Sequence, residues 1–74
     1  MGGGNPASEL KTLTNKIKML ERRAQQYGRE IDHANKRHDG HKAKHYIKLL
    51  NHTMNEIRHV QGRISYLQNV ITRR

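Results

Sequence analysis

The chain of 74 residues contains no cysteine, no tryptophan and no phenylalanine, and it has a single proline. Without cysteine it can form neither a disulfide framework nor a thiolate metal site. Only three tyrosines supply aromatic rings besides histidine, so platforms for stacking single-stranded bases are almost missing. No apolar run approaches the ~20 residues of a membrane span, and no signal peptide is visible. These absences favour an intracellular protein without a membrane partner.

Acidic residues are also scarce, and their positions argue against catalysis. Six acids stand against 15 lysines and arginines, which gives a formal net charge of +9. The acids are scattered along the chain and no two form a plausible general acid–base pair. A chain this short also offers no deep substrate pocket. We therefore expect neither an enzyme nor a cofactor.

What the sequence does contain is an apolar stripe with helical spacing, in two segments. In the first segment the spacing alternates between three and four, which is typical of a helix seam. The stripe of the first segment is Leu10, Leu13, Ile17, Leu20, Ala24, Tyr27, Ile31 and Ala34. The stripe of the second is Ala43, Ile47, Leu50, Met54, Ile57, Val60, Ile64, Leu67 and Ile71. We expect two long amphipathic helices and an all-α fold.

The two stripes differ in phase, and the change falls at the segment His38-Asp39-Gly40-His41. Asp39-Gly40 is typical of a turn, and Gly40 can adopt a positive φ after a helix ends. We predict a flexible tail over residues 1–5 and a helical hairpin over 6–74. Within it, the first helix spans about 6–38, the turn 38–41 and the second helix about 41–73.

A fold at Gly40 pairs residues whose numbers sum to about 80, such as Leu20 with Val60 and Leu13 with Leu67. Nearly every such pair is apolar on both sides, which favours an antiparallel, coiled-coil-like hairpin. A single hairpin of this size buries little core. We therefore predict that two chains dimerise into a four-helix bundle, a plan that resembles the Rop protein.

The outer side of the second helix, opposite its seam, carries no acidic residue. Every member except Gly62 can donate a hydrogen bond, whereas a solvated helix face usually mixes charges of both signs. We call these residues the outer face of the second helix: Lys44, His45, Lys48, Asn51, His52, Asn55, Arg58, His59, Gly62, Ser65, Tyr66, Asn69, Thr72 and Arg73. Such a surface fits a partner made of phosphates.

The sequence therefore predicts a dimer that binds the backbone of a nucleic-acid duplex without reading its sequence, with RNA favoured over DNA. The plan is similar to that of the helical dimers with which insect-virus silencing suppressors coat double-stranded RNA; the likeness covers residues 8–72. The predicted contacts are Lys44, His45, Lys48, Asn51, His52, Asn55, Arg58, His59, Tyr66 and Arg73, with Arg63 flanking them. The alternative is a coiled-coil module that binds an acidic protein.

Six histidines form the last feature of the sequence. His38, His41 and His45 crowd the predicted turn, and His41 and His45 have the four-residue spacing of a shared metal. No carboxylate completes a known metal motif, so we expect solvated or phosphate-facing histidines and no metal. Full protonation would raise the formal charge from +9 to +15, since the six histidines would each add one.

Overall fold

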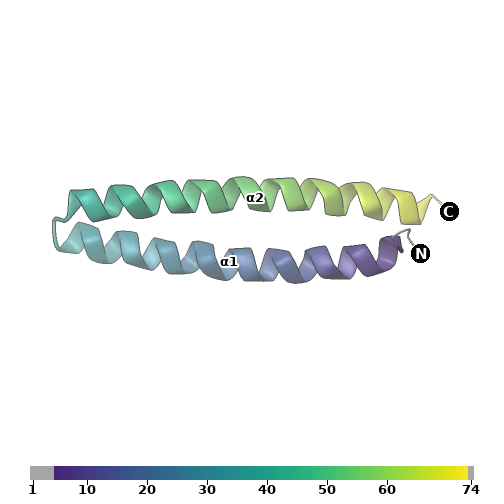
Figure 1. Cartoon of the computed structure of the whole chain (residues 1–74), viewed down its shortest axis with the longest axis horizontal. Helices are drawn as coiled ribbons and strands as arrows, with labels where there is room; N and C mark the ends of the chain where they lie inside the picture. The colour runs from purple at the N-terminus through teal and green to yellow at the C-terminus, as the bar shows by residue number, and fades with distance from the viewer. Residues whose placement is uncertain (1–4, 74) are drawn as a thin grey trace.

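The computed structural model describes residues 5–73, and this part of the chain forms two helices that pack against each other. Helix α1 spans Pro6–Lys36 and helix α2 spans Gly40–Thr72. The helices lie side by side and antiparallel, with one short turn between them and both chain ends at the far end (Figure 1). The molecule measures 54 × 19 × 16 Å. The predicted helical hairpin is confirmed; of the predicted tail, residues 1–4 lie outside the described residues, as does Arg74.

Helix α1 begins where the sequence provides a cap. The Asn5 side chain accepts a hydrogen bond of 3.0 Å from the Ala7 N–H, and Pro6 occupies the first helical position. The cap satisfies an N–H that would otherwise have no helical partner, and proline loses nothing there because its missing N–H needs none.

The turn is tighter than predicted and lies nearer the N-terminus. Arg37 caps α1, and His38 adopts a φ of 57°, in the left-handed region. The His38 N–H donates to the Asn35 carbonyl and the Asp39 N–H donates to the Ala34 carbonyl, which is the Schellman pattern. Asp39 then caps α2, because its carboxylate accepts from the Lys42 N–H at 3.0 Å. The prediction that Gly40 takes the positive φ is wrong: Gly40 is the first residue of α2.

The core is a thin strip between the helices. Its centre is Leu20, Ile57 and Val60, with Leu13, Ile17 and Ile64 half-buried around it. Ala34 and Ala43 are buried near the turn, and Leu67 is buried toward the open end. Alanine next to the turn lets the two helices approach closely where they are joined. The first predicted stripe is therefore correct as the inner side of α1.

The seam of α2 differs from the predicted stripe at Ile47 and Met54, and the last predicted member, Ile71, is also exposed. Ile47 and Met54 are 43% and 41% exposed, whereas Thr53 is only 4% exposed and Tyr46 is half-buried. A seam through Ala43, Tyr46, Leu50, Thr53, Ile57, Val60, Ile64 and Leu67 alternates three and four without a fault, as coiled-coil packing requires. The predicted stripe broke this rule at Ile57–Val60. Regular spacing outweighs the apolar character of single residues here.

The pairing of the helices also differs from prediction. The turn is centred on His38, so residues whose numbers sum to about 76 lie opposite each other. The rings of Tyr27 and Tyr46 lie 6.0 Å apart and Glu9 contacts Arg63, whose numbers sum to 73 and 72. These two sums are below the predicted value of about 80, although the core cluster does contain the predicted pair Leu20 and Val60, together with Ile57. A displacement of one turn keeps apolar positions opposite apolar positions, so several registers give consistent pairs.

Candidate nucleic-acid interface

All fourteen residues of the outer face of α2 are exposed. The predicted contact residues lie among them, with Arg63 also exposed beside the face. Because α2 is continuous from Gly40 to Thr72, Lys44 and Arg73 stand about 44 Å apart along one rigid element. The structure therefore brings the predicted residues onto one surface, which is a long strip rather than a compact site.

Two shallow hollows lie along the outer face of α2, which we also call the strip. One has a volume of 140 Å³ and is lined by His41, Lys44, His45 and Lys48 in the first turns of α2. The other has a volume of 260 Å³ and is lined by Asn55, Arg58 and His59. Both are bounded by cationic or hydrogen-bond-donating side chains, and neither lining contains a carboxylate. Hollows of this chemistry suit phosphate oxygens, which accept hydrogen bonds and carry negative charge.

The acid-free strip has one acidic neighbour. Glu56 lies at its edge, half-buried, with its Oε1 atom 3.6 Å from Nε2 of His52. If His52 is protonated, its nearest negatively charged partner is therefore Glu56 of the same helix. His52 is thus less free to contact a phosphate than His45 or His59. The four-residue spacing of His52 and Glu56 could have predicted this contact from the sequence.

Arg63 is held by the other helix. Its Nε atom donates to Oε2 of Glu9 at 3.0 Å, and Nη2 donates to Oε1 at 3.4 Å. The guanidinium also lies 5.3 Å from the ring centre of Tyr66. The hydrogen bond to Glu9, followed by the negative charge of that carboxylate, raises the pKa of Arg63. Its charge is therefore partly neutralised, and Arg63 links the open ends of the helices as well as flanking the strip.

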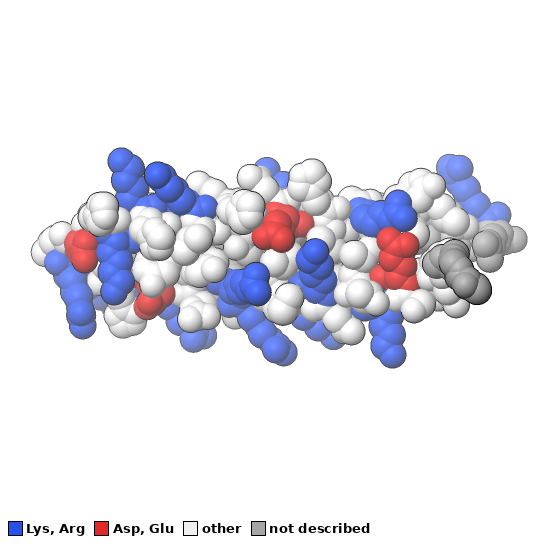
Figure 2. Space-filling view, viewed as in Figure 1, with Lys and Arg blue, Asp and Glu red and all other residues white. Residues whose placement is uncertain are grey.

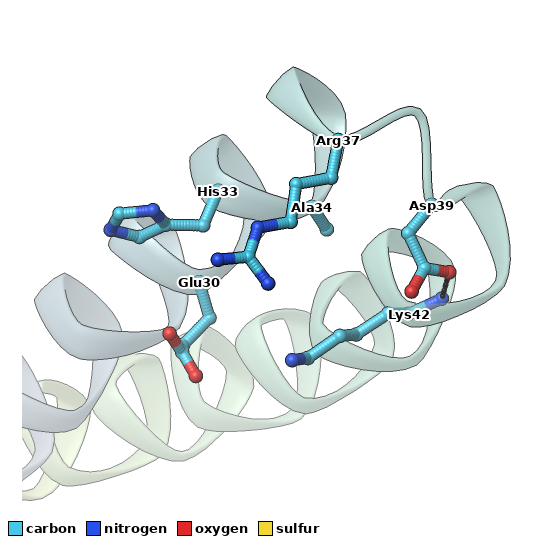
Figure 3. A pocket seen from close by; sticks show the side chains of 6 residues that line it. All are labelled: Glu30, His33, Ala34, Arg37, Asp39 and Lys42. Atoms are coloured by element: carbon cyan, nitrogen blue, oxygen red, sulfur yellow. Dashed lines mark hydrogen bonds between the residues drawn. The ribbon is translucent and has the colours of Figure 1, made fainter.

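A third hollow, beside the turn, has a different character. It has a volume of 290 Å³ and is lined by Glu30, His33, Ala34, Arg37, Asp39 and Lys42. Figure 3 shows the Glu30 carboxylate and the ends of the Arg37 and Lys42 side chains directed toward the same space. Two acids and two permanent cations balance each other there. This hollow is therefore a poor site for an anion, although it is well defined.

Glu30 also affects a neighbouring tyrosine. The negative charge of Glu30 raises the pKa of Tyr46, and the partial burial of Tyr46 acts in the same direction. Tyr46 packs against Tyr27 and against the edge of the His45 ring, at centroid distances of 6.0 and 5.4 Å. These contacts hold the N-terminal part of α2 against α1, close to the hollow lined by His41, Lys44, His45 and Lys48.

Sequence analysis missed a second set of exposed cations, on α1. These are Lys11, Lys18, Arg22, Arg29 and Lys36, which lie on the side of α1 that faces away from α2. Figure 2 shows lysine and arginine side chains over both helices, with the acidic side chains scattered between them. The sequence could have predicted this set, because the acids Glu9, Glu21 and Glu30 lie beside the α1 seam and leave the opposite side of α1 rich in cations.

Comparison with protein-family models, with curated proteins and with solved structures gave no match. No helix of residues 5–73 is long and apolar enough to cross a membrane. Within the same residues, no three histidine or carboxylate side chains gather closely enough to hold a metal ion. The likeness to duplex-coating dimers therefore remains one of plan and charge alone.

Proposed function

We propose that this protein is a non-catalytic module that binds the sugar-phosphate backbone of a nucleic-acid duplex through the outer face of α2. The observation that supports this most directly is the pair of hollows lined by Lys44, Lys48, Arg58 and their histidine and asparagine neighbours. Phosphate neutralisation by lysine and arginine provides affinity without reading sequence.

The long, straight shape also favours a duplex over a single strand. A rod of 54 Å matches about 16 base pairs at 3.4 Å each. Tyr66, 57% exposed, is the one tyrosine on the strip, and its ring faces the Arg63 guanidinium. One ring cannot stack successive bases of a single strand. RNA is favoured over DNA because the asparagine, serine and tyrosine side chains can also bond to 2′-hydroxyl groups.

A binding titration tests this proposal. Fluorescence anisotropy would compare an RNA duplex, a DNA duplex and the single strands, each at about 50 and 200 mM salt. The variant carrying Lys48→Glu and Arg58→Glu should lose duplex affinity by about 50-fold or more at about 0.1 M salt, since each counterion released contributes about eightfold.

The matched control carries Lys16→Glu and Arg23→Glu, two exposed cations on α1 that lie away from the strip. Its net charge is the same as that of the first variant, so a smaller loss shows that position matters. If both variants lose affinity equally, the strip is not the site. Absence of duplex binding at about 50 mM salt, together with capture of an acidic protein, would replace this function with the protein-binding alternative.

Gly62 provides an independent test of the strip. An added Cβ at Gly62 meets nothing within 4 Å, and the same holds for Gly28 on α1. Alanine should therefore stabilise either helix by about 0.5–1 kcal/mol. If a phosphate backbone approaches Gly62 closely, Gly62→Ala should weaken duplex binding while Gly28→Ala leaves it unchanged. Equal affinity of the two variants would show that Gly62 is only a tolerated weak point.

The assembly we propose is a homodimer through the side of the hairpin that carries Ile47 and Met54. An open groove of 470 Å³ lies there, lined by Glu21, Ala24, Gln25, Met54, Ile57, Arg58 and Gln61. A second copy is the favoured occupant because Ile47 and Met54 expose apolar surface on this side. The groove lining contains one acid and one cation, Glu21 and Arg58, so this side lacks the excess of positive charge that would repel a second chain of net charge +9. A twofold interface places the same patch on both chains.

Sedimentation equilibrium at micromolar concentration should give about twice the chain mass. Replacing Ile47 and Met54 with glutamine should give a monomer. Met19, 47% exposed on α1, provides the control, since Met19→Gln should leave the dimer intact. A parent protein that sediments as a stably folded monomer would exclude this assembly.

A further inference from the structure

The outward side of α1 carries five cations in a row. Lys11, Lys18, Arg22, Arg29 and Lys36 are spaced by seven, four, seven and seven residues, which keeps them on one side of the helix. All five are exposed. They extend over about 38 Å, because 25 residues of helix rise 1.5 Å each. We call them the α1 cation row.

The α1 cation row has one acid beside it, Asp32, which follows Arg29 by three residues and precedes Lys36 by four. Among residues 5–73 the side-chain ion pairs are Glu9–Arg63 and His52–Glu56, and neither includes a member of the row. Three acids of α1 are engaged elsewhere: Glu9 binds Arg63, Glu30 is beside Tyr46, and Glu21 lines the groove. Asp32 is the one acid on the outward side of α1.

The row and the outer face of α2 point in opposite directions. Each lies opposite its own seam, and the two seams face each other across the core. The hairpin is 16–19 Å thick, so a straight duplex that lies along one helix cannot reach the other outer side. The α1 cation row, which is about as long as the outer face of α2, would therefore contact a second duplex segment.

We infer that the hairpin bridges two nucleic-acid duplex segments, one on the outer face of α2 and the other on the α1 cation row. This inference rests on the proposed binding of a duplex by α2 and adds a second surface to it. The row has five permanent positive charges in 38 Å, whereas the outer face of α2 has four lysines and arginines in about 44 Å. Asp32 lies among these five cations, whereas the outer face of α2 has no acid, so we expect the row to bind a duplex more weakly than the outer face of α2 does.

A capture assay tests the bridge. A duplex of about 20 base pairs, longer than the hairpin, is immobilised, and the protein is added, followed by a fluorescent duplex of the same length. The parent protein should retain the fluorescent duplex on the surface. The variant carrying Arg22→Glu and Arg29→Glu should still bind one duplex in the anisotropy assay but should retain about 50-fold less of the second.

The control is again Lys16→Glu with Arg23→Glu, which has the same net charge and should retain the second duplex. If the Arg22/Arg29 variant bridges as well as the parent, the two α2 faces of a dimer account for bridging and the inference is wrong. A parent that binds one duplex but captures no second also overturns it, while leaving the proposed function intact. Loss of all duplex binding in the Lys48/Arg58 variant alone would show that the row binds nothing.

Discussion

At the scale of single residues, the turn contains a positive φ at a residue that is not glycine, although a glycine stands two positions later. A positive φ is easy for glycine and costs other L-residues about 1–2 kcal/mol. The chain nevertheless places His38 in that conformation and uses Gly40, two residues later, as an ordinary helical residue. The reason is Asp39, which must follow directly to cap α2 through the Lys42 N–H.

The first prediction is that His38→Gly stabilises the hairpin. Glycine removes the left-handed strain but adds freedom to the unfolded chain, so the free energy of unfolding should rise by about 0.5–1 kcal/mol. Gly40→Ala is the control, and it should not destabilise because a Cβ there meets nothing within 4 Å. Urea unfolding followed by circular dichroism measures both. A large loss of stability in Gly40→Ala would instead locate the positive φ at Gly40.

The second prediction concerns Tyr46 and alkaline pH. The nearby Glu30 charge raises the pKa of Tyr46, so the folded state holds the phenolic proton more tightly than the unfolded state. This stabilising effect is complete below the ordinary tyrosine pKa of about 10 and is lost as pH rises through the higher folded-state value. The ultraviolet phenolate titration of the parent minus that of Tyr46→Phe should have a midpoint above 10. Glu30→Gln should lower this midpoint; an unchanged midpoint would exclude Glu30 as the cause.

At the scale of helices, the sequence predicts the elements well and their contacts less well. The helices and the inner side of α1 follow from the three–four spacing, because burying a stripe is the main way a short helix gains stability. Ile47 and Met54 were assigned to the α2 seam because they are apolar, but Tyr46 and Thr53 keep the regular spacing and face α1. The α1 cation row was missed because charges were sorted by side for the second helix and not for the first.

The third prediction compares two isoleucines of α2. Ile57 is 7% exposed in the core, so Ile57→Ala should lower the free energy of unfolding by about 2–5 kcal/mol at any protein concentration. Ile47 is exposed in the single hairpin, so Ile47→Ala should matter only where a second chain covers it. Thermal melts over a hundredfold range of concentration distinguish these effects. If Ile47→Ala costs as much as Ile57→Ala in the monomer, the seam passes through Ile47 after all.

At the scale of the whole molecule, the hairpin is a rod, and most of its described lysines and arginines lie on its two outer sides. The inner side is nearly uncharged, and most acids lie at the margins, where they pair with Arg63 and His52 or border a hollow. This arrangement minimises repulsion between the helices and leaves cations directed outward. The net charge of +9 is therefore larger than the number of cations that a partner bound on one side could contact. A duplex bound on one side as we propose would face only four or five permanent cations.

The last prediction uses this division of charge. Affinity for one duplex should fall with salt with a log–log slope of about −3.6 for the outer face of α2, at about −0.9 for each of its four lysines and arginines. The slope should not approach the value of about −8 that nine cations on one duplex would produce. Lys48→Glu with Arg58→Glu should reduce its magnitude by about 1.8, because two phosphate contacts are lost. Anisotropy titrations at four or more salt concentrations measure it, at a pH where histidine is neutral. A slope near −8 in the parent would mean that one duplex contacts both helices, and that result would exclude two separate surfaces.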